Sequence, residues 1–318
     1  MIKHSSWTPS ASSNTLKKRS DTLHTIRSFF YNRNIYEVET PLLSQYSVTD
    51  PHIDSISSKL YQATYFLQTS PEFFMKRLLA SNSDSIFQIC KAFRHEQSSP
   101  THSAEFTMLE WYHIGIDYHA LMSEVEALIT PLLSQSIDVK KYSYQSIFFT
   151  YCQLNPLNCS IQQLEQFVVN NISEVQQAEN FSRDDWLDLI MALFIQKNMP
   201  DNQLIFIFDY PASQASLAQL SSINPLVAER FECFFNGIEL ANGFQELQNA
   251  EIQQERFKEN QNTRQHNKQP AMDIDIHFLQ ALQHGLPFCS GVALGIDRLM
   301  MIILNKHNIE ECMSFSDI

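Results

Sequence analysis

The chain has 318 residues, of which 44% are hydrophobic, and a net charge of −13 from 35 acidic and 22 basic side chains. This length is sufficient to bury a full-sized core, and the composition indicates one large domain over residues 1–318. The acidic balance argues against broad binding to nucleic-acid backbones, which needs clustered Lys and Arg, although it leaves room for a local basic patch.

Signals for export, membrane insertion and metal binding are also weak. No stretch approaches the roughly 18 apolar residues of a membrane span, and the start, MIKHSSWTPSASSN, lacks the apolar core of a secretory signal. The six cysteines form no C-x-x-C pair and no compact group with histidines, so neither a zinc site nor a disulfide framework is predicted. We therefore expect a cytoplasmic protein without a membrane partner.

The first third of the chain predicts helices and a hairpin. Residues 16–32 have apolar side chains at helical spacing, and 36–41 form a short extended piece that ends at proline. A helix is predicted for 70–81, with Pro71 at its first position and Glu72 in its first turn. Two strand-like runs follow at 86–96 and 105–114, joined by a polar loop.

The remainder predicts an α+β fold. Residues 117–129 and 184–196 have helical patterns, and the apolar run 204–211 is typical of a strand buried on both faces. Asn236-Gly237 separates two alternating runs, which strongly indicates a hairpin. A Gln-rich helix is predicted for 244–268, and residues 290–304 are predicted to form a glycine-bearing strand or turn together with the apolar helix that follows it. Together these elements indicate an antiparallel β-sheet flanked by helices.

Glycine is scarce, and its distribution is uneven. Of only 6 glycines, four lie in two short segments: Gly237, Gly243, Gly291 and Gly295. Because glycine permits positive φ and close approach of a ligand to the backbone, these segments are predicted to have special backbone conformations.

The first predicted hairpin concentrates charge on one face. Arg94 and Glu96 are two residues apart on one strand, and Phe106, Glu110 and Tyr112 share a face of the other. A guanidinium and two carboxylates on the inner face of a sheet are costly unless they are paired or contact a ligand. The pattern therefore indicates a ligand site, with a structural salt-bridge network as the alternative.

The second hairpin and the last helix add further candidates. Glu239 is followed by Asn242 and Glu246, and carboxylates beside glycine suit Mg²⁺, which takes oxygen ligands. Gly295 precedes Arg298 at the opening of the last predicted helix. The G-x-x-x-G spacing at 291–295 is weak evidence by itself, since close helix packing also explains it.

These segments resemble a known family. VETP at 38–41 resembles motif 1 of class II aminoacyl-tRNA synthetases, FRHE at 93–96 with EFTMLE at 105–110 resembles motif 2, and GIDR at 295–298 resembles motif 3. TSPE at 69–72 and ELANGFQEL at 239–247 resemble the lysyl branch. Three further segments are similar to its stand-alone paralogues that modify elongation factor P: SWTPSAS at 6–12, PASQASLAQ at 211–219 and CSGVALGIDRL at 289–299. The resemblance covers essentially the whole chain and implies the class II catalytic core.

The resemblance implies an ATP site that also uses Mg²⁺. Arg94 would bridge the substrate carboxylate and the α-phosphate, and Arg298 would cover the adenine and reach the γ-phosphate. Phe106 would stack on the adenine and Glu96 would accept from its amino group, while Glu239 would hold the metal. Arg94, Arg298 and Glu239 are thus the expected catalytic residues. The other residues of the implied ATP site are His95, His102, Ser103, Leu240 and Gly295.

The resemblance also implies a lysine site. Glu72, Glu110, Tyr112 and Glu246 would meet the substrate's amino groups, and Asn242 its carboxylate, with Ser70, Pro71 and Ala293 completing the site. Ala293 stands where the tRNA enzymes typically have glycine, and in the modifying family this accompanies a preference for (R)-β-lysine over α-lysine. Ser103 stands where the family usually has asparagine.

The implied activity is transfer of (R)-β-lysine, or lysine, through an adenylate to a lysine ε-amino group of elongation factor P. Because motif 1 is reached by residue 41, we expect no anticodon-binding domain and no use of tRNA. Motif 1 also implies a homodimer. A truncated ligase for tRNA or a small molecule remains an alternative, as does an inactive regulator, although the presence of Arg94, Glu239 and Arg298 argues against the latter.

Overall fold

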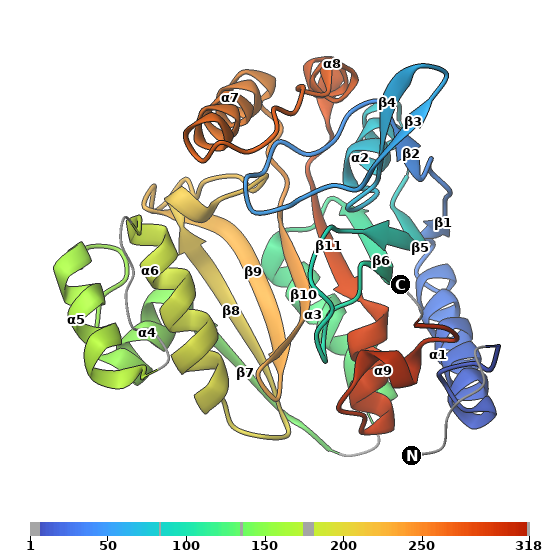
Figure 1. The fold of residues 1–318 in the computed structure, drawn as a ribbon, viewed down its shortest axis with the longest axis horizontal. Coiled ribbons are helices and arrows are strands. Elements are labelled where there is room, and N and C mark those ends of the chain that lie inside the picture. Colours follow the sequence, from blue (N-terminus) through green and yellow to red (C-terminus); the bar gives the residue numbers. More distant parts are fainter. Residues whose placement is uncertain (1–6, 83, 134–135, 174–180, 317–318) are drawn as a thin grey trace. The chain divides into compact units, whose positions relative to one another are not determined.

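The computed structural model describes residues 7–82, 84–133, 136–173 and 181–316. The described residues form two compact units (Figure 1): those of unit 1 lie within 1–117, 127–134 and 248–318, and those of unit 2 within 118–126 and 135–247. The single domain expected over 1–318 stays a prediction. Residues 1–6 of the expected non-secretory start, including the first residue of the 6–12 segment, lie outside the described residues.

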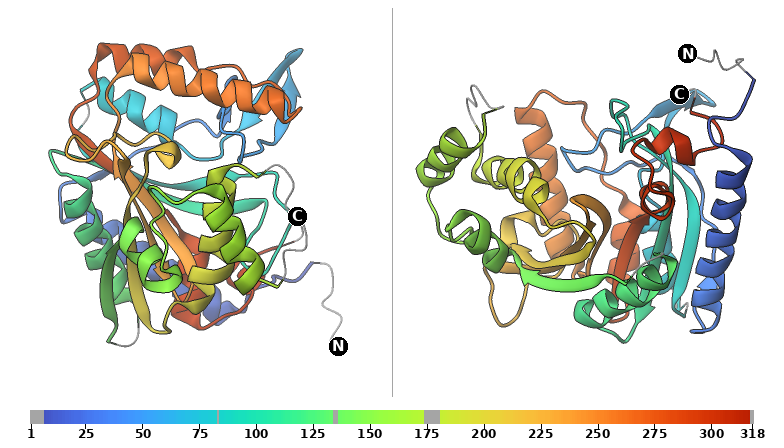
Figure 2. Two further views of the ribbon diagram at one scale, coloured as in Figure 1. Left: turned by 90° about the vertical axis from the view of Figure 1, so that its left-hand side faces the viewer. Right: turned by 90° about the horizontal axis from the view of Figure 1, so that it is seen from below.

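Unit 1 contains a main group of strands in the order β1-β5-β6-β11. β1 (Tyr36–Glu37) runs parallel to β5 (Ile86–Phe93), β5 pairs antiparallel with β6 (Glu105–Ile114), and β6 pairs antiparallel with β11 (Cys289–Gly295). A second, three-stranded sheet has the order β2-β4-β3, with β2 (Leu43–Ser44), β4 (Ala63–Leu67) and β3 (Ser57–Leu60). Figure 2 gives two further views of these strands.

The helices of unit 1 cover its sheets. They are α1 (Ser13–Tyr31), α2 (Glu72–Ala80), η1 (Thr130–Leu132), α7 (Ala250–His266), α8 (Ile276–Gly285), α9 (Ile296–Leu304) and η5 (Ile309–Cys312). The predicted amphipathic helix is confirmed as α1, which buries Phe30 against the sheet. The Phe30 ring stacks on Phe87 with centroids 4.5 Å apart and meets the edge of Trp111 at 5.2 Å. Aromatic packing of this kind contributes beyond the area it buries.

The described residues of unit 2 include strands in the order β10-β9-β8-β7. They are β7 (Asp138–Ser143), β8 (Gln203–Pro211), β9 (Val227–Phe235) and β10 (Ile238–Gln245), and β7 and β8 pair in parallel. Its helices are α4 (Tyr144–Cys152), α5 (Ile161–Asn171), α6 (Arg183–Ile190), η2 (Met191–Ile195), η3 (Gln196–Asn198) and η4 (Ala212–Gln214), together with most of α3 (Tyr118–Ile129).

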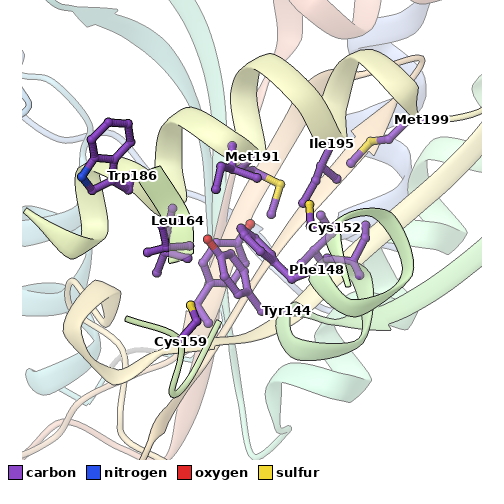
Figure 3. Packing of buried hydrophobic residues seen from close by; sticks show 14 of the residues in the cluster. Tyr144, Phe148, Cys152, Cys159, Leu164, Trp186, Met191, Ile195 and Met199 are labelled. Atoms are coloured by element: carbon purple, nitrogen blue, oxygen red, sulfur yellow. The ribbon is translucent and has the colours of Figure 1, made fainter. Parts of the chain in front are cut away.

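The core of unit 2 lies between β8, β9 and the helices (Figure 3). Ile205 and Ile207 of β8 pack there with Tyr144 and Phe148 of α4 and Trp186 of α6. This confirms the expectation that the apolar run at 204–211 forms a buried strand, because a strand covered by helices needs no polar alternation.

Three expectations are corrected. The strand predicted for 86–96 ends at Phe93, so Arg94 and Glu96 lie in the following loop. The helix predicted for 244–268 starts only at Ala250, because β10 continues to Gln245. The sheet strands are not all antiparallel, since β1 and β7 each pair in parallel. The α+β class itself is confirmed.

The predicted hairpin turn is present between β9 and β10. Asn236 has φ 52° and Gly237 has φ 72°, the left-handed conformations that a two-residue type I′ turn requires. Of the four glycines expected in special conformations, Gly237 alone has a positive φ. Among the described residues, no helix combines the length and the apolar character needed to cross a membrane.

Candidate active site

The strands of unit 1 bring three predicted site residues onto one face. Phe106 pairs with Ala92 of β5, and Glu110 of β6 pairs with Ala293 of β11. Directly paired residues of antiparallel strands share a face, with Cβ atoms about 5 Å apart. Phe106, Glu110 and Ala293 therefore face the same way, and the methyl group of Ala293 lies beside Cβ of Glu110.

Arg94 reaches this face although it lies beyond the end of β5. Its guanidinium carbon is 5.3 Å from the Phe106 ring centroid, and one terminal nitrogen is 4.0 Å from Glu96. Both charged side chains are about one-third exposed, and an exposed ion pair of that length contributes little to stability. In the described part of the chain, the buried Nε of Arg94 has no hydrogen-bond partner. The arrangement favours a ligand site over a structural salt-bridge network.

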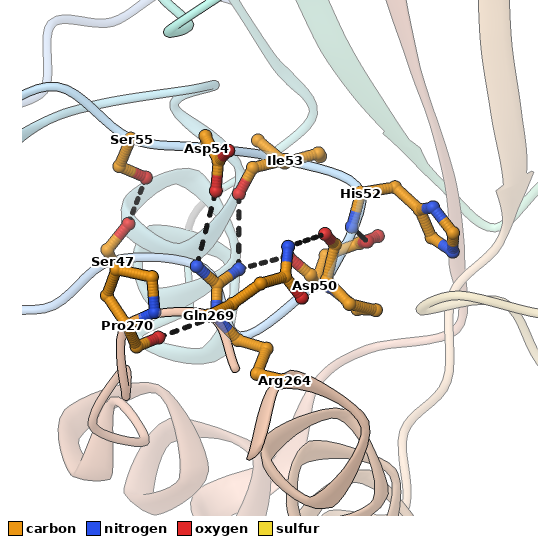
Figure 4. A network of polar contacts seen from close by, with 10 residues as sticks. Ser47, Asp50, His52, Ile53, Asp54, Ser55, Arg264, Gln269 and Pro270 are labelled. Carbon is orange, nitrogen blue, oxygen red and sulfur yellow. Dashed lines mark hydrogen bonds and ion pairs between the residues drawn. The ribbon is translucent and has the colours of Figure 1, made fainter. Parts of the chain in front are cut away.

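A buried arginine orders the loop that supports this region (Figure 4). Arg264, in the last turn of α7, is 1% exposed and donates to the carbonyl oxygens of Pro270 at 2.9 Å and Asp50 at 2.8 Å, and to Asp54 Oδ1 at 3.3 Å. The carbonyl of Asp54 in turn accepts from the backbone N–H of His95 at 2.8 Å. Arg264 thus fixes the loop that holds the residue after Arg94. The sequence offered no local signal for this role.

Arg298 lies in the first turn of α9 and contacts the loop between β5 and β6. Its Nε donates to the carbonyl of Thr101 at 3.2 Å, and one terminal nitrogen lies 2.8 Å from Nε2 of His102. Since a guanidinium can only donate, Nε2 accepts and the ring is neutral. Burial, and then the charge of Arg298, lower the pKa of His102 below its ordinary value. The Nδ1 of His102 lies 2.8 Å from Ser99 Oγ.

Two further residues of the expected ATP site lie near these contacts in unit 1. A Cβ added to Gly295 would lie 3.7 Å from Cδ of Arg298, so the arginine side chain passes directly over the glycine. Ser103 is half-buried, beside His102 in the same loop. Gly295 thus contacts Arg298 directly, and Ser103 is next to a residue that contacts it.

Unit 1 also gathers three of the residues expected to meet an amino group. The Tyr112 hydroxyl donates to Glu110 at 2.6 Å, and both residues are 2% exposed. Glu72, at the start of α2, accepts from the buried Lys76 at 2.5 Å. The Lys76 ammonium is also 6.0 Å from the Tyr112 ring centroid, which connects the two groups. Lys76 was not predicted as a site residue, because the sequence does not show which face of helix α2 is buried.

The two remaining residues of this segment start α2. Pro71 is the residue immediately before the helix, one position earlier than expected, and Ser70 Oγ accepts from the backbone N–H of Glu72 at 3.3 Å. The contact with Ser70 fixes the backbone position from which the Glu72 side chain extends.

In unit 2, a β-bulge aligns Glu239 with Asn242. Glu239 pairs with Phe234 and Asn242 with Glu232, because the register shifts between Glu239 and Ala241. The two residues therefore share a face although they are three positions apart, with Leu240 as the extra residue. Simple alternation would put them on opposite faces. Glu246 follows the end of β10 and is 1% exposed.

Arg230 and Glu232 were missed by the sequence reasoning and lie beside these residues. Arg230 pairs with Glu232 at 2.5 Å, and the Tyr210 hydroxyl donates to the other carboxylate oxygen at 2.6 Å. Asn242 contacts both, accepting from Arg230 at 3.3 Å and donating to Glu232 at 3.4 Å. The two-residue spacing in RFECFF was the available signal, as it was for Arg94 and Glu96.

The carboxylates of unit 2 fit a divalent cation. The pKa of Glu232 is raised to about 7, because burial and then repulsion from Glu239 together outweigh the attraction of Arg230. Two carboxylates that disfavour each other's charge are stabilised by a cation. Within the described residues no group of three or more His, Cys, Asp and Glu side chains could hold a metal, but Mg²⁺ commonly uses one or two carboxylates with substrate phosphates.

Comparison with known proteins identifies the family. The chain belongs to the class II tRNA synthetases (D, K and N), whose family model matches residues 3–318. The chain is also similar to curated proteins named elongation factor P–(R)-β-lysine ligase. It is 44% identical to that of Haemophilus ducreyi over 97% of this chain and 95% of the relative, and 42% identical to that of Vibrio cholerae over 98% of each. The relative from Pseudoalteromonas translucida is 43% identical over 97% of each chain. The resemblance inferred from the motifs is thereby confirmed.

Proposed function

We propose that this chain is an ATP-dependent ligase that activates (R)-β-lysine as an adenylate and transfers it to the ε-amino group of a lysine on elongation factor P. The observation that carries the proposal is the similarity, at 41–44% identity over nearly the whole chain, to proteins that bear this ligase name. The charged residues of motifs 2 and 3 support it, since Arg94 and Arg298 are both present and both lie beside aromatic or loop groups suited to a nucleotide.

The first step forms the adenylate. An oxygen of the lysine carboxylate attacks the α-phosphorus of ATP, and pyrophosphate leaves with the electron pair of the broken P–O bond. Arg94 would bind the carboxylate and the α-phosphate and stabilise the charge that develops between them. In the second step the acceptor amine attacks the carbonyl carbon, AMP leaves, and the amine loses a proton. No nucleophilic side chain of the enzyme is required.

Further residues would contribute to nucleotide binding. In unit 1, Phe106 would stack on the adenine, Glu96 would accept from its amino group, and Arg298 would reach the γ-phosphate, with His95, His102, Ser103 and Gly295 completing the contacts. In unit 2, Glu239 with Glu232 would hold Mg²⁺, beside Leu240. The metal would screen the phosphate charges.

Carboxylates would select the diamino acid. In unit 1, Glu72, Glu110 and Tyr112 would accept from its ammonium groups, beside Ser70, Pro71 and Ala293. In unit 2, Glu246 would accept from an ammonium group and Asn242 would bind the carboxylate. A substrate that lacked an amino group would not form the ammonium contacts that offset desolvation of these carboxylates, which gives strong discrimination.

Substitution of Ala293 tests the preference for β-lysine. Because its methyl group lies beside Glu110, Ala293→Gly enlarges the space there, and we expect the kcat/KM ratio of α-lysine to β-lysine in ATP–pyrophosphate exchange to rise about tenfold. Ala92→Gly is the matched control, since Ala92 pairs with Phe106, and it should leave the ratio unchanged. An unchanged ratio in Ala293→Gly would remove Ala293 as the selector.

The decisive experiment is the intact mass of elongation factor P after incubation with this protein, Mg-ATP and either α- or β-lysine, with bulk tRNA as a competing acceptor. We expect the mass of elongation factor P to increase by one lysyl unit, and a larger fraction of it to be modified with β-lysine than with α-lysine. No transfer to tRNA is expected. Pyrophosphate release without a protein adduct would instead support a ligase for tRNA or a small molecule. The homodimer, the absence of tRNA use and the cytoplasmic location stay predictions.

A further inference from the structure

We infer that Arg19 of α1 is a positioning residue for ATP, because it joins the residues that follow Phe106 and precede Arg298. This inference rests on the proposed ATP site. One terminal nitrogen of Arg19 lies 2.7 Å from Oδ1 of Asp297, and the other donates to Oγ1 of Thr107 at 2.8 Å. The guanidinium thus contacts α9 and β6 at once, from a helix that carries none of the motif residues.

The contacts form a closed ring. The second oxygen of Asp297, Oδ2, accepts from the backbone N–H of Thr107 at 2.5 Å, so each member of the ring contacts the other two. Asp297 is 1% exposed and Thr107 7%, while the Arg19 side chain is 14% exposed. A guanidinium whose two terminal nitrogens each contact a different buried residue fixes both the distance and the orientation of those residues.

The position of the ring connects it to ATP. Thr107 directly follows Phe106, and Asp297 directly precedes Arg298, the two groups proposed to lie against the adenine. Pairing of Gly295 with Met108 brings the start of α9 to this part of β6, and the ring then fixes the separation of the two backbones. Without Arg19, Asp297 would keep one backbone donor but lose its charge partner, and a buried carboxylate in that state is costly.

A purely structural role would give a different result from a positioning role. If the ring only supported the fold, its loss would lower the melting temperature and weaken binding of ATP and of the amino acid together. If the ring positions Phe106 and Arg298, its loss should weaken ATP binding selectively. Calorimetric titration of Mg-ATP without amino acid measures this directly and requires no turnover.

We expect Arg19→Met to raise the Kd for Mg-ATP at least about tenfold and to change the KM for β-lysine by less than about twofold. Arg27→Met is the matched control: Arg27 lies on the same helix and pairs with Glu37 at 2.9 Å, but outside the ring. It should leave both constants within about twofold of wild type. Equal changes in the ATP and β-lysine constants of Arg19→Met, or an unchanged Kd for ATP, would overturn the inference.

Two milder variants cover the case in which Arg19→Met does not fold. Arg19→Lys retains the charge but cannot contact Asp297 and Thr107 together, and Thr107→Val removes the hydroxyl acceptor at nearly constant volume. Both variants should raise the Kd for Mg-ATP by a smaller factor than Arg19→Met does. If neither variant raised the Kd, the inference would be overturned. Wild-type protein that binds Mg-ATP but modifies no acceptor would reject the proposed function while leaving this comparison decisive. Wild-type protein that does not bind Mg-ATP would overturn both.

Discussion

His102 illustrates how a permanently charged neighbour fixes the protonation state of a titratable group. Its Nε2 lies 2.8 Å from the Arg298 guanidinium, a donor that never loses its charge at accessible pH. The charged groups that act on the ring are Arg298, Glu96 and Arg94, and the two arginines both favour the neutral form. The contact therefore exists only while His102 is unprotonated, which makes the position of the Arg298 side chain dependent on pH.

The resulting prediction concerns the KM for ATP below the ordinary His102 pKa of 6.5. Because the folded pKa lies below that value, the contact is intact at pH 7 and is lost as pH falls through the folded pKa. Wild-type KM should then rise by up to about tenfold per pH unit, whereas His102→Gln, which retains an acceptor but cannot titrate there, should remove this rise. Identical pH profiles for the two proteins would contradict the assignment.

The same shift predicts the direction of the stability change. Between the folded pKa and 6.5 the unfolded chain binds more protons at His102 than the folded chain does, so the free energy of unfolding falls as pH is lowered through this range. Well above pH 6.5 neither state is protonated at this residue, and its contribution is constant. Urea titrations of wild type and His102→Gln across this range would measure the difference.

At the scale of elements, two glycines separate the cost of a left-handed backbone from the cost of a clash. Gly115 and Gly237 have φ of +83° and +72°, but a Cβ on Gly115 would meet nothing within 4 Å, whereas one on Gly237 would lie 2.5 Å from the carbonyl oxygen of Gln196. Gly115→Ala should cost about 1 kcal/mol in the free energy of unfolding, and Gly237→Ala about 2–4 kcal/mol. Urea unfolding measures both, and equal losses would show that the turn moves away from Gln196.

Elements with local signals could be predicted from the sequence, and those ended by distant contacts could not. Alternation over 105–114 matches β6, and Asn236-Gly237 marks the turn between β9 and β10. The end of β5 was missed because the alternating pattern continues past Phe93, while the backbone N–H of His95 leaves the hairpin to donate to Asp54. The bulge at Leu240 was missed for a similar reason, since two-residue periodicity cannot show an inserted residue.

At the scale of the whole molecule, the motifs identify residue types but not the residues that hold them. Arg94, Glu110 and Arg298 were found because their segments resemble a family. Their supporting residues, including Arg19 and Arg264, have partners far away in the sequence, and no local spacing encodes such pairs. The motifs in the sequence therefore identified the residues of the candidate site, whereas many of the residues that hold them in place became visible only in the structure.

The predicted homodimer has a specific surface to test in unit 1. All four residues of β3 are exposed, and large apolar side chains are exposed on or near the small sheet, with Leu42 41%, Leu60 38% and Tyr61 87% accessible. Exposed edge strands and apolar patches of this kind favour association with another chain. Because motif 1 at 38–41 immediately precedes Leu42, we expect a second copy to cover this surface.

Light scattering should then give twice the chain mass of 36.8 kDa. The double substitution Leu60→Lys and Tyr61→Ser places charge and polarity on the surface and should shift the mass to that of one chain, without loss of the folded circular dichroism spectrum. Ile223→Ser, which changes a 94% exposed apolar residue of unit 2, is the control and should leave the dimer intact. A wild-type mass of 36.8 kDa would refute the dimer, and a double variant that stayed dimeric would place the interface elsewhere on the chain.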